Sequence, residues 1–148
     1  MNFSENLREI DAAFIARVFL GFLFFLQGYD KVFRIGVKQV IQTIHEPLSS
    51  KGIPKIFSNV GAYFTSYVEL ICGAFLILGF LKYASLYLLG FDMLFVAIVF
   101  GIVEPIWDMK HIFPRLSLLL FLLILPSQWD VISIDHVWSF INFLKSTL

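Results

Sequence analysis

The sequence predicts an all-α fold: an integral membrane four-helix bundle with an interfacial amphipathic helix between the first and second membrane helices. Of its 148 residues, 59% are hydrophobic and 15% charged, whereas ordinary soluble domains are about 45–50% apolar and about 25% charged. The mean hydropathy is +0.84, and the apolar residues gather in runs approaching the ~20 residues that cross a bilayer. A soluble globule of this size has too little interior to hide that surface, whereas lipid covers it.

Composition also limits the classes of function. The formal net charge is zero, so nothing in the overall charge favours nucleic-acid binding. Cys72 is the one cysteine, which excludes an intrachain disulfide and a CxxC redox pair. The three histidines lie far apart without ligand-spaced neighbours, so we expect no metal site.

The apolar runs divide a single domain, residues 1–148, into four spans. We expect these spans at about 11–35, 58–80, 83–101 and 109–129. The short turn at Lys82 makes the second and third spans antiparallel neighbours. The last span is the least regular, because Pro126 ends or bends it. The tail, residues 130–148, places aromatic side chains among polar ones, which predicts an interfacial segment and not a fifth crossing.

The segment between the first two spans, residues 36–57, differs in kind. Four apolar residues in it keep helical spacing with polar residues between them: Val37, Val40, Ile41 and Ile44. This pattern predicts an amphipathic helix that lies in the membrane interface, and a helix docked on the bundle is the alternative. We expect Pro47 and the serines, glycine and proline after it to break this helix into a loop.

The first span, which includes the long apolar run 14–33, shows how another helix could pack on it. Gly21 and Gly28 share the helical face of Arg17, and small residues let membrane helices approach closely. The basic residues of the following loop set the expected orientation: Lys31, Arg34, Lys38, Lys51 and Lys55. They place that loop in the cytoplasm and both termini outside. Alternatively, the first three of them serve an anionic site.

Four charges inside the apolar runs are the main clue to function: Arg17, Glu69, Asp92 and Arg115. Each costs roughly 2.5–3.5 kcal/mol at the centre of a span, so each should have a partner. With a rise of about 1.5 Å per residue, Arg17 lies roughly 9 Å deep from one side and Glu69 roughly 16 Å. We therefore expect Arg17 to reach Glu69, with Asp92 as a further partner. Arg115 enters from the opposite side, with Asp30 and Glu104 as nearer partners and snorkelling to the headgroups as the main expectation.

These charges have two interpretations. Intramembrane ionisable residues mark ligand sites, ion paths or proton relays, and an Arg–Glu pair can hold a small polar headgroup or a quinone carbonyl. The alternative is a structural ion pair that fixes helix register. The candidate ligand-binding polar network comprises Arg17, Gln27, Lys31, Glu69, Asp92 and Arg115.

Several motifs also resemble one family. The run AFIARVFLGFLFFLQGYDKVF, with Arg17, Gln27, Gly28 and Lys31, is similar to the first helix of the DoxX/DoxD-like family of small four-helix membrane proteins. The segment YVELICGAFLILGF resembles its E-x3-G-x5-G pattern, and the loop ending in Gly-Ile-Pro is also similar. The segment LPSQWDVISID resembles the Gly-rich segment before a Ser-x-Asp motif with which the family's sequences end. It has Ser133 and Asp135 of that motif, but Pro-Ser-Gln replaces the family's glycines.

The resemblance implies a membrane subunit of a quinone-linked redox complex, with quinone as the candidate cofactor and a protein partner beside the lipid bilayer. Such a subunit would be co-catalytic and would reside in the bacterial cytoplasmic (inner) membrane. The alternatives are a non-catalytic binding or assembly protein that holds a partner, and a small-solute or proton carrier, which the lone acid Asp92 motivates. A dithiol reaction would need cysteines that this chain lacks.

Overall fold

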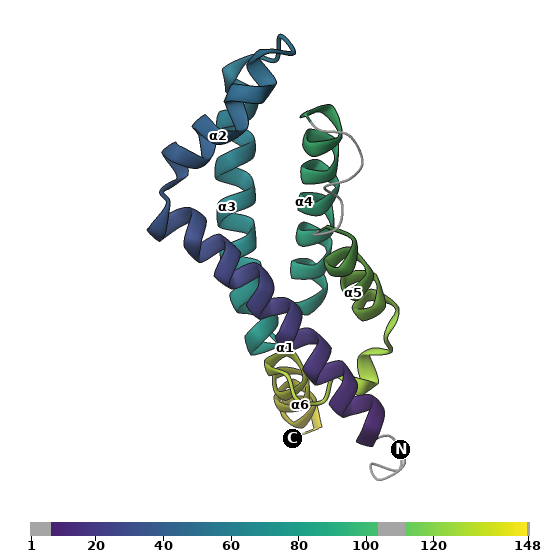
Figure 1. Cartoon of the computed structure of the whole chain (residues 1–148). Helices are drawn as coiled ribbons and strands as arrows, with labels where there is room; N and C mark the ends of the chain where they lie inside the picture. Colours follow the sequence, from purple (N-terminus) through teal and green to yellow (C-terminus); the bar gives the residue numbers. More distant parts are fainter. Residues whose placement is uncertain (1–6, 104–111, 148) are drawn as a thin grey trace.

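A computed structural model describes residues 7–103 and 112–147, and these residues are helical throughout apart from short turns (Figure 1). The helices are α1 (Leu7–Tyr29), the π-helical turn η1 (Asp30–Arg34), α2 (Val37–Ser49), α3 (Lys55–Leu78), α4 (Lys82–Val103), α5 (Ile112–Ile124), the 3₁₀ turn η3 (Ser127–Trp129) and α6 (Ile134–Thr147). The first expected span is thus a helix that widens into a π turn, and the first residues of the fourth lie outside the described residues.

Helix α2 continues two residues beyond Pro47 and ends at Ser49, within the segment that was predicted to break it. Proline removes one intrahelical hydrogen bond, but near a C-terminus little of the helix depends on that bond. The chain turns away only at Gly52, whose φ of 76° is left-handed. There Ile53 N donates to Leu48 O at 3.2 Å, and Gly52 N donates to Ser49 O at 3.0 Å, the bond pair of a Schellman motif.

Helix α1 packs most extensively against α3, and glycines make the close approach possible. A Cβ atom on Gly28 would lie 2.3 Å from the backbone nitrogen of Leu70, and one on Gly73 would lie 2.4 Å from that of Phe25. Both distances are shorter than atoms tolerate, so only glycine fits at these positions. The expectation that glycines on the Arg17 face allow another helix to approach is confirmed.

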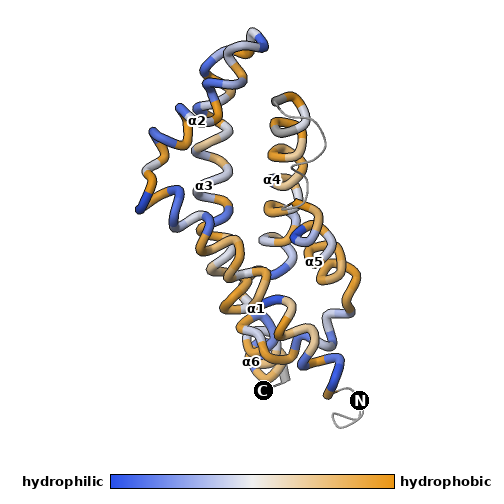
Figure 2. The backbone as a smooth tube through the Cα atoms, viewed as in Figure 1, coloured by the Kyte–Doolittle hydropathy of each residue, from blue (hydrophilic) through white to orange (hydrophobic). Residues whose placement is uncertain are grey.

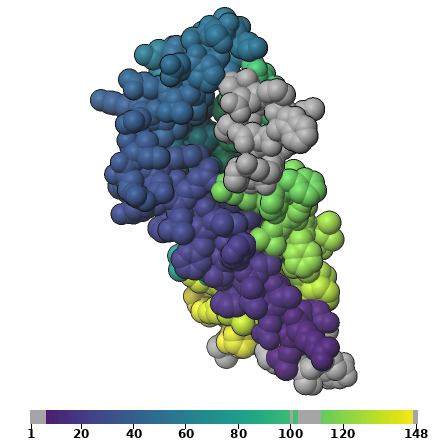
Figure 3. Space-filling view, in the orientation of Figure 1, coloured from purple at the N-terminus to yellow at the C-terminus, as the bar shows by residue number. Residues whose placement is uncertain are grey.

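The remaining packing joins four helices in a cycle: α3 contacts α4, α4 contacts α5, and α5 returns to α1. In the space-filling view, α1 (purple) runs obliquely across the visible face with α5 (green) beside it (Figure 3). The buried core between these helices includes Leu20, Phe24, Leu76, Leu89 and Leu122. A second, smaller apolar cluster docks α2 on α3.

Two of the described helices are long and apolar enough to cross a membrane: α3, and α4 over Lys82–Val99, whereas the apolar helix α5 is shorter. The hydropathy colouring follows this distribution, with orange, hydrophobic backbone along α4 and α5 (Figure 2). Helix α4 also turns large apolar side chains outward along one face: Tyr87, Phe91, Leu94 and Ile98. Lipid contact would cover such a stripe, whereas water would not.

Candidate functional site

The charged residues inside the apolar helices form two separate clusters. We call the first the Arg17 cluster: Arg17, Lys82 and Asp130. It lies where the N-terminal half of α1 meets the end of α3 and the start of α4. We call the second the Lys31 cluster: Gln27, Lys31, Glu69, Asp92 and Arg115. It lies near the other end of α1, beside a cavity.

In the Arg17 cluster, the expected pair of Arg17 with Glu69 is wrong. Arg17 Nε lies 3.0 Å from Asp130 Oδ1, and its Nη1 and Nη2 donate to the carbonyl oxygens of Leu76 and Ile132. The physical reason is depth. Leu76, which Arg17 contacts, lies seven residues, roughly 10 Å, beyond Glu69 along α3. The chain after α5 folds back toward Arg17 and places Asp130 beside it.

Asp130 completes the Arg17 cluster. Its second oxygen lies 3.3 Å from Lys82 Nζ, and all three charged side chains are buried. Two buried cations thus share one acid, and the carbonyl oxygens take up further guanidinium donors. Sequence reasoning missed Asp130 and Lys82, because it assigned the former to the interfacial tail and the latter to a turn.

The segment after Asp130 forms hydrogen bonds to the α3–α4 turn, next to the Arg17 cluster. The Asp135 carboxylate accepts from the backbone nitrogens of Leu81 and Lys82, each at 2.9 Å, and so caps the start of α4. Ser133 Oγ donates to Asp130 O at 2.7 Å and accepts from His136 N at 3.2 Å. The Ser-x-Asp motif that the sequence singled out is therefore the joint between α6 and the α3–α4 turn.

In the Lys31 cluster, Lys31 is the partner of Glu69. The Lys31 ammonium, on the π turn, lies 2.7 Å from Glu69 Oε2 at the middle of α3. Glu69 is 2% exposed and Lys31 18% exposed, so the acid is the buried member of the pair. The pair joins the end of α1 to α3.

Arg115 does not snorkel away from the helices. Its Nη1 donates to Gln27 Oε1, and its guanidinium lies over the ring of the buried Phe24, 6.0 Å from the centroid. The expected partner Asp30 instead pairs with Arg34 at the surface, and Glu104 lies outside the described residues. Arg115 thus has a hydrogen-bond partner and no carboxylate partner among the residues that the structure describes.

Asp92 is the least satisfied of the buried charges. It is 0% exposed, and neither carboxylate oxygen has a hydrogen-bond partner within the described ranges. The charges of Glu69 and Lys31 act on it electrostatically. The structure therefore places Asp92 with the Lys31 cluster and not with Arg17.

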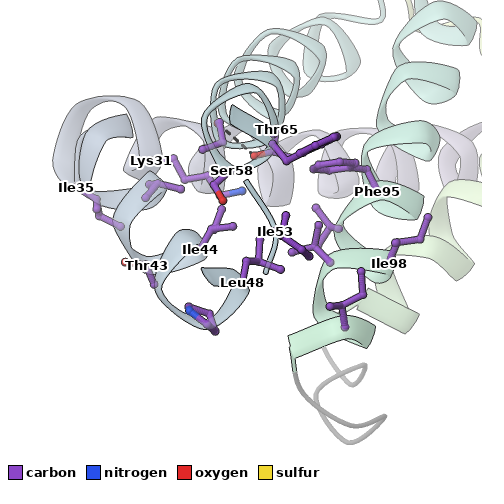
Figure 4. Close-up of a pocket in the computed structure, with 18 of the residues that line it drawn as sticks. Lys31, Ile35, Thr43, Ile44, Leu48, Ile53, Ser58, Thr65, Phe95 and Ile98 are labelled. Carbon is purple, nitrogen blue, oxygen red and sulfur yellow. Dashed lines mark hydrogen bonds between the residues drawn. The ribbon is translucent and has the colours of Figure 1, made fainter. Parts of the chain in front are cut away.

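A cavity of about 490 Å³ lies beside this cluster, between α2 and α3 on one side and α4 on the other. Its walls are mostly apolar, and Gln27 and Lys31 are among the few polar residues that line it. Figure 4 shows Lys31 beside it. The labelled side chains around it include Leu48 and Ile53 near α2, and Phe95 and Ile98 on α4. The volume lies within the ~300–1,000 Å³ range of small-molecule sites.

The site can bind and orient a ligand. Over residues 7–103 and 112–147, no group of three or more His, Cys, Asp or Glu residues is arranged to hold a metal ion. Cys72 is buried in the helix core. Gln27 and Lys31 can donate hydrogen bonds to a ligand, and the apolar walls can take a ring or a chain.

Comparison with protein-family models matches residues 12–102 to the DoxX family. Searches of curated proteins and of solved structures give no match. The matched range includes Arg17, Gln27, Lys31, Glu69 and Asp92, together with most of the cavity wall. Because the match covers more than half of the chain, this protein belongs to the DoxX family of membrane proteins.

Proposed function

We propose that this DoxX protein is a four-helix integral membrane protein that binds a lipophilic small molecule in the cavity beside Lys31. In this proposal it serves as the membrane subunit of a quinone-linked redox complex in the bacterial cytoplasmic membrane. One observation carries the proposal: an apolar cavity of about 490 Å³ ends at the Lys31–Glu69 ion pair. Ionisable residues inside membrane spans are costly, and those that occur usually belong to a functional site.

The arrangement of helices supports four crossings. Helices α1, α3, α4 and α5 pack in a cycle, and α1 has 23 residues, enough for about 35 Å of helix. The outward apolar stripe on α4 gives such a bundle a surface for lipid. In this arrangement the cavity lies within the bilayer, where a lipophilic ligand enters from the side.

The side chains fit a quinone. Lys31 and Gln27 can donate hydrogen bonds to a ring carbonyl, and the apolar walls can hold the ring and part of its tail. A bound quinone would supply two-electron redox chemistry. The chain itself would orient the ring and exclude water. Because the chain has one cysteine, a partner protein would supply the electrons.

The test is mass spectrometry of the full-length protein purified gently from its membrane, with quinone, lipid and protein quantified together. The variant Val99→Trp fills the cavity wall on α4, whereas Val60→Trp adds the same side chain on the exposed side of α3. We expect stoichiometric quinone in the wild type and in Val60→Trp, and its loss in Val99→Trp. A wild type without quinone, or equal quinone in both variants, would contradict the proposal.

Helix α6 favours a second function, that of holding a protein partner. It is attached to the remainder through its first turn, and it exposes large apolar side chains, including Val137, Trp138 and Phe140. A partner that co-purifies stoichiometrically without quinone, and is lost in Trp138→Ser but not in Ser139→Ala, would favour this function over the first.

A further inference from the structure

The charge of Lys31 beside the cavity is already balanced. Lys31 Nζ, which reaches the cavity, lies 2.7 Å from a carboxylate oxygen of the buried Glu69. In a low-dielectric site this attraction is strong and little screened by salt. A ligand that approaches Lys31 therefore meets an ion pair and not a free cation.

Two further ionisable side chains, Arg115 and Asp92, belong to the same cluster. Arg115 acts electrostatically on Glu69, but Asp92, buried and without a hydrogen-bond partner in the described part, acts on the same site. The cluster thus holds two cationic and two acidic side chains. An anionic headgroup placed against Lys31 would lose its hydration and approach the Glu69 carboxylate, which is costly in an apolar site.

At Lys31 and Gln27, the remaining hydrogen-bonding capacity is that of donors. An ammonium has three N–H bonds, and Lys31 directs one contact to Glu69. Arginine has no acceptor, so Gln27 must offer its oxygen to Arg115, which leaves the amide NH₂ for the cavity. The Thr65 and Thr43 hydroxyls in the wall donate to backbone carbonyls of their own helices.

From this balance we infer that the cavity takes an uncharged amphiphile whose polar end accepts hydrogen bonds from Lys31 and Gln27, and that it discriminates against anionic lipids and fatty acids. The inference rests on the proposed function, because it presumes that a lipophilic ligand occupies the cavity. It adds that the site selects by charge: a neutral carbonyl, ester or ether oxygen is accepted and a carboxylate or phosphate is not. Glu69 then acts as the residue that determines specificity, because it cancels the charge of Lys31.

The test uses two competitors of equal chain length, 2-heptadecanone and heptadecanoate, against a fluorescent apolar probe bound to the purified full-length protein. For the wild type we expect the ketone to displace the probe at a concentration about tenfold lower than the carboxylate does, a difference of about 1.4 kcal/mol. The variant Glu69→Gln frees the charge of Lys31 and should reverse the preference. Glu46→Gln, on the exposed side of α2, should leave it unchanged.

A double variant covers the case in which Glu69→Gln does not fold. Lys31→Met combined with Glu69→Gln removes the ion pair without leaving a buried charge, and it should lower ketone affinity without raising carboxylate affinity. A wild type that prefers the carboxylate would overturn the inference but leave the proposed function intact. Failure of both competitors, with probe binding also unaffected by Val99→Trp, would overturn the proposed function and the inference with it.

Discussion

The two charge clusters lie about 20 Å apart along α1 and differ in how well their charges are satisfied. In the Arg17 cluster, each charged side chain lies within ion-pair distance of an opposite charge, and Arg17 also reaches three backbone carbonyls. In the Lys31 cluster, Asp92 has no hydrogen-bond partner and Arg115 no carboxylate partner within the described residues. The pocket beside the first cluster, about 350 Å³ at Lys82 and Asp130, is lined almost entirely by polar side chains, whereas the cavity beside the second, about 490 Å³, has mostly apolar walls.

This difference indicates two roles for intramembrane charges in one small chain. A fully bonded network fixes the relative positions of the segments that it joins, here α1, the α3–α4 turn and the start of α6. A network with unused donors and an unpartnered acid lowers the stability of the fold. Its position beside an apolar cavity suggests that these groups serve a ligand. We therefore assign the Arg17 cluster to the fold and the Lys31 cluster to the ligand.

The largest expected effect comes from Asp130→Asn. Loss of this acid leaves Arg17 and Lys82 as two buried cations without a counter-charge, and breaking a buried pair in this way costs about 3–5 kcal/mol. Thermal unfolding of the purified protein in detergent measures the loss. The control is Asp30→Asn, which breaks the exposed pair with Arg34 and should cost less than about 1 kcal/mol. Equal losses in both variants would contradict the structural role of the Arg17 cluster.

Gly79→Ala should perturb the same cluster by packing. Gly79 has φ 68°, and an added Cβ would lie 2.8 Å from Arg17 Nη1 and 2.6 Å from Ser133 Cβ. We expect a loss of about 2–4 kcal/mol from backbone strain and overpacking together. Gly36→Ala is the matched control, because its φ is 83° but no atom lies within 4 Å of the added Cβ. It should cost about 1–2 kcal/mol, and an equal cost in both would show that Arg17 tolerates displacement.

Asp92→Asn should have the smallest effect on folding. It removes a charge that has no hydrogen-bond partner in the described part, so the free energy of unfolding should change by less than about 1 kcal/mol or increase. The comparison with Asp130→Asn sharpens the contrast, since both acids are buried and both lose the same charge. A loss as large as that of Asp130→Asn would show that Asp92 also belongs to a structural network.

The sequence alone predicted the helical elements well, because apolar runs and 3.6-residue spacing depend on local pattern. It placed a helix at Val37–Ile44 and recognised that Gly21 and Gly28 face a neighbouring helix. It also predicted that α2 ends in the segment that begins at Pro47, where Gly52 and its Schellman bonds set the end of the helix.

Partner choice was harder to predict. Depth along ideal helices placed Arg17 near Glu69, but α1 crosses α3 obliquely (Figure 1). Lys31, after the end of α1, therefore meets Glu69, whereas Arg17 meets Leu76 near the end of α3. The partner Asp130 follows a proline in a polar segment, and no spacing rule brings it back to Arg17. Sequence reasoning included Lys31, Gln27 and Arg115 among the candidates, but which of them contact one another depends on helix packing.

The most direct test of the division between the clusters measures unfolding and ligand preference together in Asp130→Asn and Glu69→Gln. We predict that Asp130→Asn lowers the unfolding temperature and that its folded fraction still prefers 2-heptadecanone to heptadecanoate. We predict that Glu69→Gln, whose partner Lys31 retains some access to solvent, loses less stability and reverses the preference. If Glu69→Gln instead loses as much stability as Asp130→Asn and keeps the wild-type preference, both clusters are structural and the account is contradicted.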